Sequence, residues 1–185
     1  MDAQRLLSEV ARLPMRESCS LSVEKCVYER LAYPARNGGL ERAFIEWAQA
    51  DARIAAFCKV SETRHDFVRL RYVKADGLPA FYSLDFLARD RNGAAYLVET
   101  KATEQVNAPN VQRKLKAALT WCERVNNLPE NHRQATWRYV LLAENVFHDW
   151  RDKQASLAEL LAFARVRAHA DFTKQNDLLS GLPTT

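Results

Sequence analysis

The chain has 185 residues, 48% of them apolar, which suits one domain with a substantial hydrophobic core. Its 27 Lys and Arg residues against 23 Asp and Glu give a net charge of +4, which permits a nucleic-acid partner without requiring one. The four cysteines lack zinc-site spacing, and no apolar run is long enough for a signal peptide or a membrane span. These features predict a cytoplasmic protein with reduced cysteines and no membrane partner.

The chain divides into one main domain and two shorter ends. We interpret residues 1–35 as an N-terminal extension that begins with a short amphipathic helix. Residues 36–170 form the predicted domain, and residues 171–185 form a polar C-terminal tail. No internal repeat or low-complexity segment interrupts this order.

The first predicted element of the domain is an amphipathic helix over residues 40–50, in which apolar side chains recur at helical spacing. It exposes Glu41 and Glu46. The next two segments, 53–60 and 66–74, are predicted strands, and the second of them alternates apolar with basic side chains, as expected of a strand with one buried face.

Two apolar runs, 80–89 and 94–101, follow as predicted strands. The residues Asp90-Arg91-Asn92-Gly93 between them are typical of a hairpin turn. Four strands are therefore expected before the next helix.

The apolar period changes to helical from Asn110, where the predicted helix carries Arg113, Lys114, Lys116 and Arg124 beside one apolar stripe. Residues 137–143 are a predicted buried strand, and Ser156-Leu-Ala-Glu159 is a capping box that starts a helix to about residue 169. The element order predicts an α/β fold of the α+β type, with a mixed sheet and helices packed on it.

Two charged residues end the strand 94–101 in an unusual setting. Side chains alternate across a strand, so Leu97, Glu99 and Lys101 share one face. Both faces are apolar up to Glu99, which predicts a central strand. A carboxylate and an ammonium at the end of such a strand indicate a site.

A three-residue hairpin loop, with Gly93 in the left-handed conformation, would pair Asp90 with Ala94 and set Asp85 opposite Glu99. Directly opposed carboxylates repel each other unless a cation lies between them. Mg²⁺ commonly binds one or two carboxylates and leaves its other positions to water and phosphate oxygens. With Lys101 close by to orient water or stabilise developing charge, the pattern suits phosphodiester hydrolysis.

A simpler interpretation remains open for the same residues. An Asp in one strand and a Glu-Thr-Lys at the end of another occur often as solvated edges or plain ion pairs. A loop one residue shorter would also set Asp85 opposite Thr100 and turn Glu99 to the other face.

The pattern Leu84-Asp85, thirteen residues, then Glu99-Thr100-Lys101 resembles the PD-(D/E)xK nuclease motif. The segments GGLERAFIEWAQADARIAAFCKV, FYSLDF, YLVETKA and NVQRKLKAALTWCERVN are similar to the C-terminal endonuclease domain of type III restriction enzyme Res subunits. This resemblance covers roughly residues 25–145 and implies a restriction-endonuclease-like αβββαβ core with extra N- and C-terminal helices. Leu84 stands where the family has proline, and Ala102 where it commonly has glycine.

The resemblance implies a role for each matching residue. Asp85 and Glu99 correspond to the metal-binding acids, Lys101 to the catalytic lysine, and Glu41 to an acid that often completes the site. Glu41 could equally be a favourable charge at a helix start, with Glu46 as the fallback.

The helix that borders the cleft in such folds corresponds here to the one that carries Gln112, Lys114 and Lys116. These three residues are candidate DNA contacts. The alternative is an ordinary solvated face, which is the commoner meaning of such a basic run.

The implied activity is a Mg²⁺-dependent endonuclease acting on double-stranded DNA. No GxxxxGK[ST] phosphate loop occurs, so an ATPase would come from a helicase region or chain, and target recognition from a methylation and recognition subunit. The alternatives are a catalytically silent DNA-binding or scaffold domain of the same fold, or another PD-(D/E)xK nuclease of repair or mobile-element origin.

Overall fold

The computed structural model describes residues 17–36, 39–65 and 68–165. The elements, in chain order, are β1 (Ser20–Ser22), β2 (Arg30–Ala32), α2 (Gly39–Ala50), β3 (Ile54–Lys59), β4 (Arg69–Val73), β5 (Pro79–Ser83), β6 (Phe86–Asp90), β7 (Ala94–Lys101), α3 (Pro109–Asn126), β8 (Thr136–Ala143) and α4 (Glu144–Asp152). Short 3-10 turns lie at Glu17–Cys19, Thr103–Gln105 and Glu130–His132. Residues 157–165 are helical.

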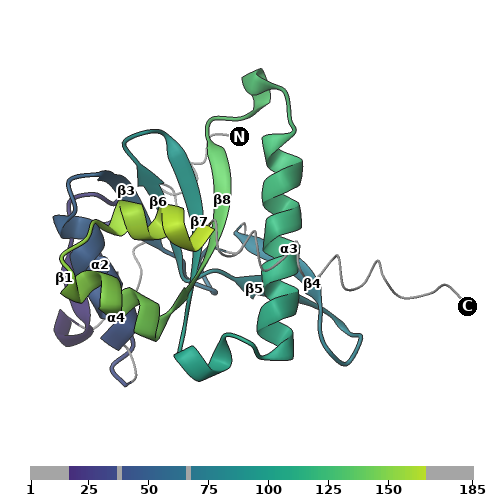
Figure 1. The fold of residues 1–185 in the computed structure, drawn as a ribbon, viewed down its shortest axis with the longest axis horizontal. Helices are drawn as coiled ribbons and strands as arrows, with labels where there is room; N and C mark the ends of the chain where they lie inside the picture. The colour runs from purple at the N-terminus through teal and green to yellow at the C-terminus, as the bar shows by residue number, and fades with distance from the viewer. Residues whose placement is uncertain (1–16, 37–38, 66–67, 166–185) are drawn as a thin grey trace, which may run out of the picture.

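A four-stranded sheet in the order β3-β6-β7-β8 forms the centre of the fold (Figure 1). β6 is antiparallel to both of its neighbours, β3 and β7, whereas β8 runs parallel to β7. β7 is flanked on both sides and is buried along nearly its whole length. The predicted central strand and the predicted mixed α/β architecture are both confirmed.

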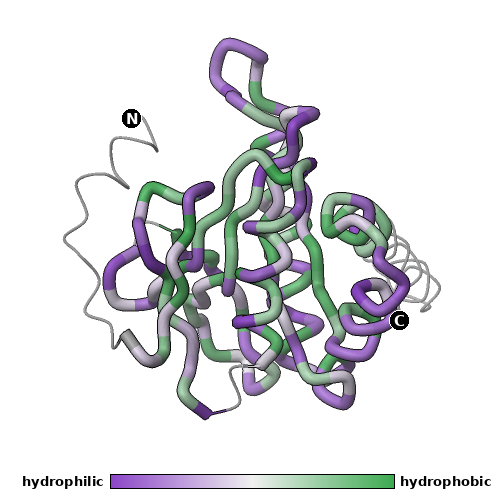
Figure 2. Tube along the Cα trace, turned by 90° about the vertical axis from the view of Figure 1, so that its left-hand side faces the viewer, coloured by the Kyte–Doolittle hydropathy of each residue, from purple (hydrophilic) through white to green (hydrophobic). Residues whose placement is uncertain are grey.

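Each face of the sheet is covered by its own hydrophobic core. The helices α2 and α4 and residues 157–165 cover one face, where Phe44 stacks on Phe86 with ring centroids 4.3 Å apart. Helix α3 and the β4–β5 hairpin cover the other face, where Leu97 of β7 packs with Leu115 of α3. Hydrophobic segments accordingly run through the centre of the molecule (Figure 2).

The turn between β6 and β7 has the predicted form. Gly93 adopts a positive φ of 84°, the left-handed conformation that glycine tolerates best. The Asp90 side chain accepts a hydrogen bond from the Ala94 amide at 2.9 Å. The ladder that follows pairs Phe86 with Val98, which is the register expected from a three-residue loop.

The predicted single strand over 80–89 is wrong, because it is broken at Leu84 and Asp85. β5 pairs with β4 in a separate two-stranded sheet, while β6 joins the central sheet. Leu84 is buried beneath α3, and Asp85 uses its carboxylate to bind Thr100 instead of continuing the ladder. Five strands rather than four therefore lie between α2 and α3.

Two other features were not predicted. The strands β1 and β2 form a hairpin within the segment interpreted as an extension, and Val23 and Leu31 join the core beside α2. Helix α4 follows β8 directly, with Phe147 as its buried anchor.

The capping box before residue 157 forms only in part. The Ser156 amide donates to Glu159 at 3.2 Å, but the Ser156 hydroxyl donates to Asp51. The end of this predicted helix and the expected helix near the N-terminus lie outside the described residues. No helix in the described ranges is both long and apolar enough to cross a bilayer.

Candidate functional site

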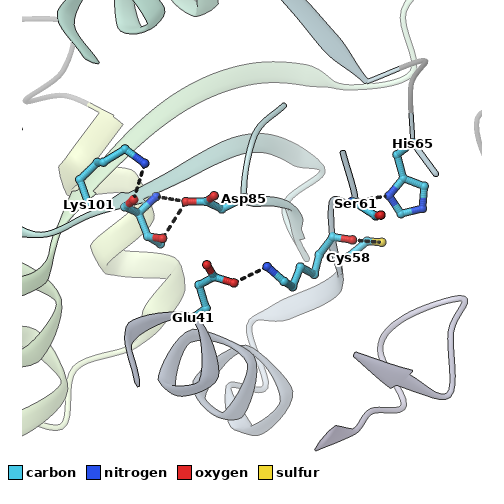
Figure 3. A network of polar contacts seen from close by, with 8 residues as sticks. Glu41, Cys58, Ser61, His65, Asp85 and Lys101 are labelled. Atoms are coloured by element: carbon cyan, nitrogen blue, oxygen red, sulfur yellow. Dashed lines mark hydrogen bonds and ion pairs between the residues drawn. The ribbon is translucent and has the colours of Figure 1, made fainter. Parts of the chain in front are cut away.

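Asp85 lies at the point where the chain enters the central sheet. Its amide donates to the Val98 carbonyl at 3.2 Å, so the backbone leaves the regular ladder one pair short of the predicted Asp85–Glu99 pair. Its Oδ2 accepts two hydrogen bonds from Thr100, one from the amide and one from the hydroxyl, both at 2.7 Å (Figure 3). Asp85 is thus fixed by the middle residue of the Glu-Thr-Lys segment.

Glu99 is the most buried charged group of the site, with a side chain that is only 3% exposed. Its Oε1 contacts the Lys101 amine at 2.7 Å, and its Oε2 is buried without any hydrogen-bond partner. Burial, and after it the negative charge of Asp85, raises the pKa of Glu99 to about 7 although Lys101 opposes the change. Asp85 thus acts on Glu99 through its negative charge, while its own carboxylate is bound to Thr100.

Lys101 ends β7 on the same face as Glu99, as the alternation predicted. Its amine also donates to the Thr100 carbonyl at 3.1 Å (Figure 3). Burial lowers the pKa of Lys101, but the negative charges of Glu99, Asp85 and Glu41 outweigh burial and hold the pKa above its ordinary value. The ammonium is thus charged and bound to an acid.

Glu41 lies in the first turn of α2 and forms an ion pair with Lys59 at the end of β3 (Figure 3). Both side chains line a cavity of about 390 Å³ that also includes Asp85. Glu41 therefore shares this cavity with Asp85, whereas Glu99 does not line it. Glu46 instead pairs with Arg42 and does not line this cavity, so the arrangement favours Glu41 over its fallback.

The three candidate DNA contacts on α3 occupy different positions. Gln112 donates to the Val106 carbonyl at 2.8 Å and so closes the turn before the helix. The Lys114 amine lies 5.1 Å from the ring centre of Tyr82, and its positive charge acts to lower the pKa of Glu99. Lys116 is exposed. DNA contact by these residues stays a prediction.

Two residues of the site were not found from the sequence. Lys59 pairs with Glu41, and no spacing along the sequence predicts a contact between the end of the strand at residue 59 and the start of the helix at residue 41. Thr100 holds Asp85, a role that the break in the predicted strand concealed. Its position inside the Glu-Thr-Lys segment was the one available signal.

The part of the chain that the structure describes has no group of three or more His, Cys, Asp or Glu side chains arranged to hold a metal. The residues present nevertheless fit a two-carboxylate Mg²⁺ site. Burying a carboxylate oxygen without a hydrogen-bond partner costs free energy, and Glu99 has such an oxygen. A hard divalent cation would bind this oxygen and offset that cost. Asp85 and Glu99 are the side chains that could hold it.

No family model, curated protein or solved structure matches this chain.

Proposed function

We propose that this protein is a Mg²⁺-dependent nuclease that hydrolyses phosphodiester bonds in double-stranded DNA. The observation that carries the proposal is the buried Glu99 carboxylate at the end of the central strand. One of its oxygens has no partner, Asp85 lies near enough to raise its pKa, and Lys101 is bound to it. Structural ion pairs seldom leave a buried carboxylate oxygen unsatisfied.

Asp85 and Glu99 would hold the ion, and water and phosphate oxygens would fill its other positions. When bound, Mg²⁺ supplies Lewis-acid stabilisation of the phosphate charge. A Glu99 carboxyl with a pKa of about 7 is partly protonated near neutrality, so ion binding there displaces a proton from it.

In this proposal the Lys101 ammonium orients the attacking water and stabilises the charge on the phosphate. It is still 22% exposed, so its amine can exchange the Glu99 contact for a substrate oxygen. In the proposed reaction the water oxygen bonds to phosphorus while the bond from phosphorus to the leaving oxygen breaks. The attacking water gives up one proton to solvent and the leaving oxygen takes one from solvent, so the protons balance, and the charge that develops on the phosphate is stabilised by the ammonium.

The order of elements supports a restriction-endonuclease-like core. The helix α2, the strands β3, β6 and β7, helix α3 and strand β8 follow the αβββαβ sequence, with the β4–β5 hairpin as an insertion. Under this proposal Glu41 completes the acidic site. The resemblance to type III Res subunits suggests a cytoplasmic protein whose partners are a helicase and a recognition subunit.

The test is cleavage of supercoiled plasmid DNA by wild type and Lys101→Ala, with Mg²⁺ or with EDTA. Lys153→Ala is the matched control, because Lys153 is a highly exposed lysine of the opposite face, paired with Asp149. Nicking that needs Mg²⁺, fails in Lys101→Ala and persists in the control supports the proposal. DNA binding without cleavage, also with an added helicase partner, would instead indicate a catalytically silent DNA-binding domain.

A further inference from the structure

The β4–β5 hairpin has one buried face and one bare face. Its register pairs Leu70 with Tyr82, and both side chains pack into the core beneath α3. The tip is fixed as well, since the Ala75 amide donates to the Asn110 side chain at 2.9 Å. The hairpin is therefore a two-stranded arm whose buried face is attached to α3 (Figure 1).

The bare face combines arginines with large apolar side chains. Its cross-strand pairs are Arg69 with Ser83, Arg71 with Phe81, and Val73 with Pro79. Among the described residues six large apolar side chains are exposed, and three belong to this hairpin: Phe81 at 63%, Leu78 at 57% and Val73 at 51%. Such clustering on one element indicates a contact surface.

The charge on this face is of one sign. None of its six paired residues is acidic, and within the described chain neither Arg69 nor Arg71 has a carboxylate partner. Arg71 lies over the Phe81 ring at 5.7 Å from its centre. The two arginines are ~6.8 Å apart along the strand, so each can reach a different phosphate.

The basic end of the face borders the candidate site. Ser83, the partner of Arg69, lines the same cavity as Asp85. Arg69 itself donates at 2.7 Å to the carbonyl of Glu62, which also lines that cavity. A polyanion bound by the arginines would therefore extend into the cavity. The apolar tip of the hairpin would contact the same polyanion farther from the cavity.

We propose that the bare face of the β4–β5 hairpin is the DNA-binding surface of this protein. Arg69 and Arg71 bind successive backbone phosphates, and Phe81 and Val73 lie against sugars and base edges in the minor groove, where apolar side chains commonly enter. The inference rests on the proposed function for its ligand, DNA, but concerns binding rather than cleavage.

The test measures the affinity of a labelled duplex by fluorescence anisotropy in EDTA over a series of salt concentrations. Arg69→Ala with Arg71→Ala should weaken binding about 10-fold and reduce the slope of log affinity against log salt by about 1.8. The matched control removes two cations at the C-terminal end of α4 on the opposite face, Arg151→Ala in its last turn with Lys153→Ala just after it, and should bind as wild type.

The apolar part is tested on Phe81. Phe81→Ala should weaken binding about 10-fold without changing the salt slope, whereas Phe81→Leu, which keeps apolar contact, should lose about 3-fold or less. Phe163→Ala removes another exposed aromatic, beyond α4, and should have no effect. Thermal melting checks that each variant folds.

The outcomes separate this inference from the nuclease proposal. Hairpin variants that bind DNA as tightly as wild type overturn the inference, even if plasmid cleavage depends on Lys101. Hairpin variants that change self-association in sedimentation but not DNA affinity also overturn it, because the face is then an interface between copies. Hairpin-dependent binding without any cleavage supports the inference and removes the nuclease proposal alone.

Discussion

Glu99 should make the stability of this protein depend on pH. Its carboxyl has a pKa of about 7 in the folded protein against an ordinary value of 4.5. An acid with a raised pKa binds its proton more tightly in the folded state, so its favourable contribution is complete below pH 4.5 and is lost as pH rises to about 7. At about 1.4 kcal/mol for each tenfold change, the gap corresponds to about 3 kcal/mol.

The perturbation is Glu99→Gln, which keeps the shape of the protonated side chain but cannot ionise. We expect the stability of Glu99→Gln relative to wild type to increase by about 3 kcal/mol between pH 4.5 and pH 8. The charged and titratable side chains that interact with Glu99 are Asp85, Lys101, Lys114, Tyr82 and Tyr139.

The assay is urea denaturation of both proteins at about pH 4.5, 6, 7 and 8, a range that spans the titration of Glu99, and it gives the free energy of unfolding at each pH. The comparison cancels groups that both proteins share. One of these is His65, whose pKa is lowered by burial and whose contribution is lost as pH falls, the opposite direction. A difference between the two proteins that does not change with pH would refute the reasoning.

Three further predictions concern the site and its support. Thr100→Val removes the hydroxyl that donates to Asp85, so unfolding in urea should show a loss of about 1.5 kcal/mol and plasmid cleavage should slow about 10-fold; unchanged cleavage would mean that Asp85 needs no such anchor. Glu41→Gln should reduce Mg²⁺-dependent cleavage at least about 10-fold and Glu46→Gln should not, and the reverse result would give Glu46 the role. Phe86→Ala should cost about 3–5 kcal/mol in the same urea assay, and a loss below about 1 kcal/mol would contradict the assigned core.

Local patterns predicted the parts of the fold that depend on neighbouring residues. Gly93 and its turn fixed the β6–β7 register, because a loop of known length sets which residues pair. The apolar side chains on both faces of β7 predicted a central strand, because a strand that is buried on both faces is apolar on both. The adjacency of Glu99 and Lys101 followed from alternation alone.

Long-range contacts account for what the sequence could not predict. The run 80–89 is mostly apolar, and its break at Asp85 depends on Thr100, fifteen positions away in a different strand. The pairing of Glu41 with Lys59 depends on how α2 packs beside β3, and no spacing along the chain encodes it. Helix α4 was missed because only Phe147 of its nine residues is buried.

The central claim is that Asp85 and Glu99 together hold one Mg²⁺ ion, and calorimetric titration with Mg²⁺ tests it most directly. The titration compares Lys101→Ala, which cannot cleave, with the same variant that also carries Asp85→Asn and Glu99→Gln, both in the presence of duplex DNA. We predict one ion for each site with both carboxylates intact, with proton release near pH 7, and loss of that binding when both carboxylates are replaced. Equal Mg²⁺ binding by both proteins, or none by either, would contradict the account.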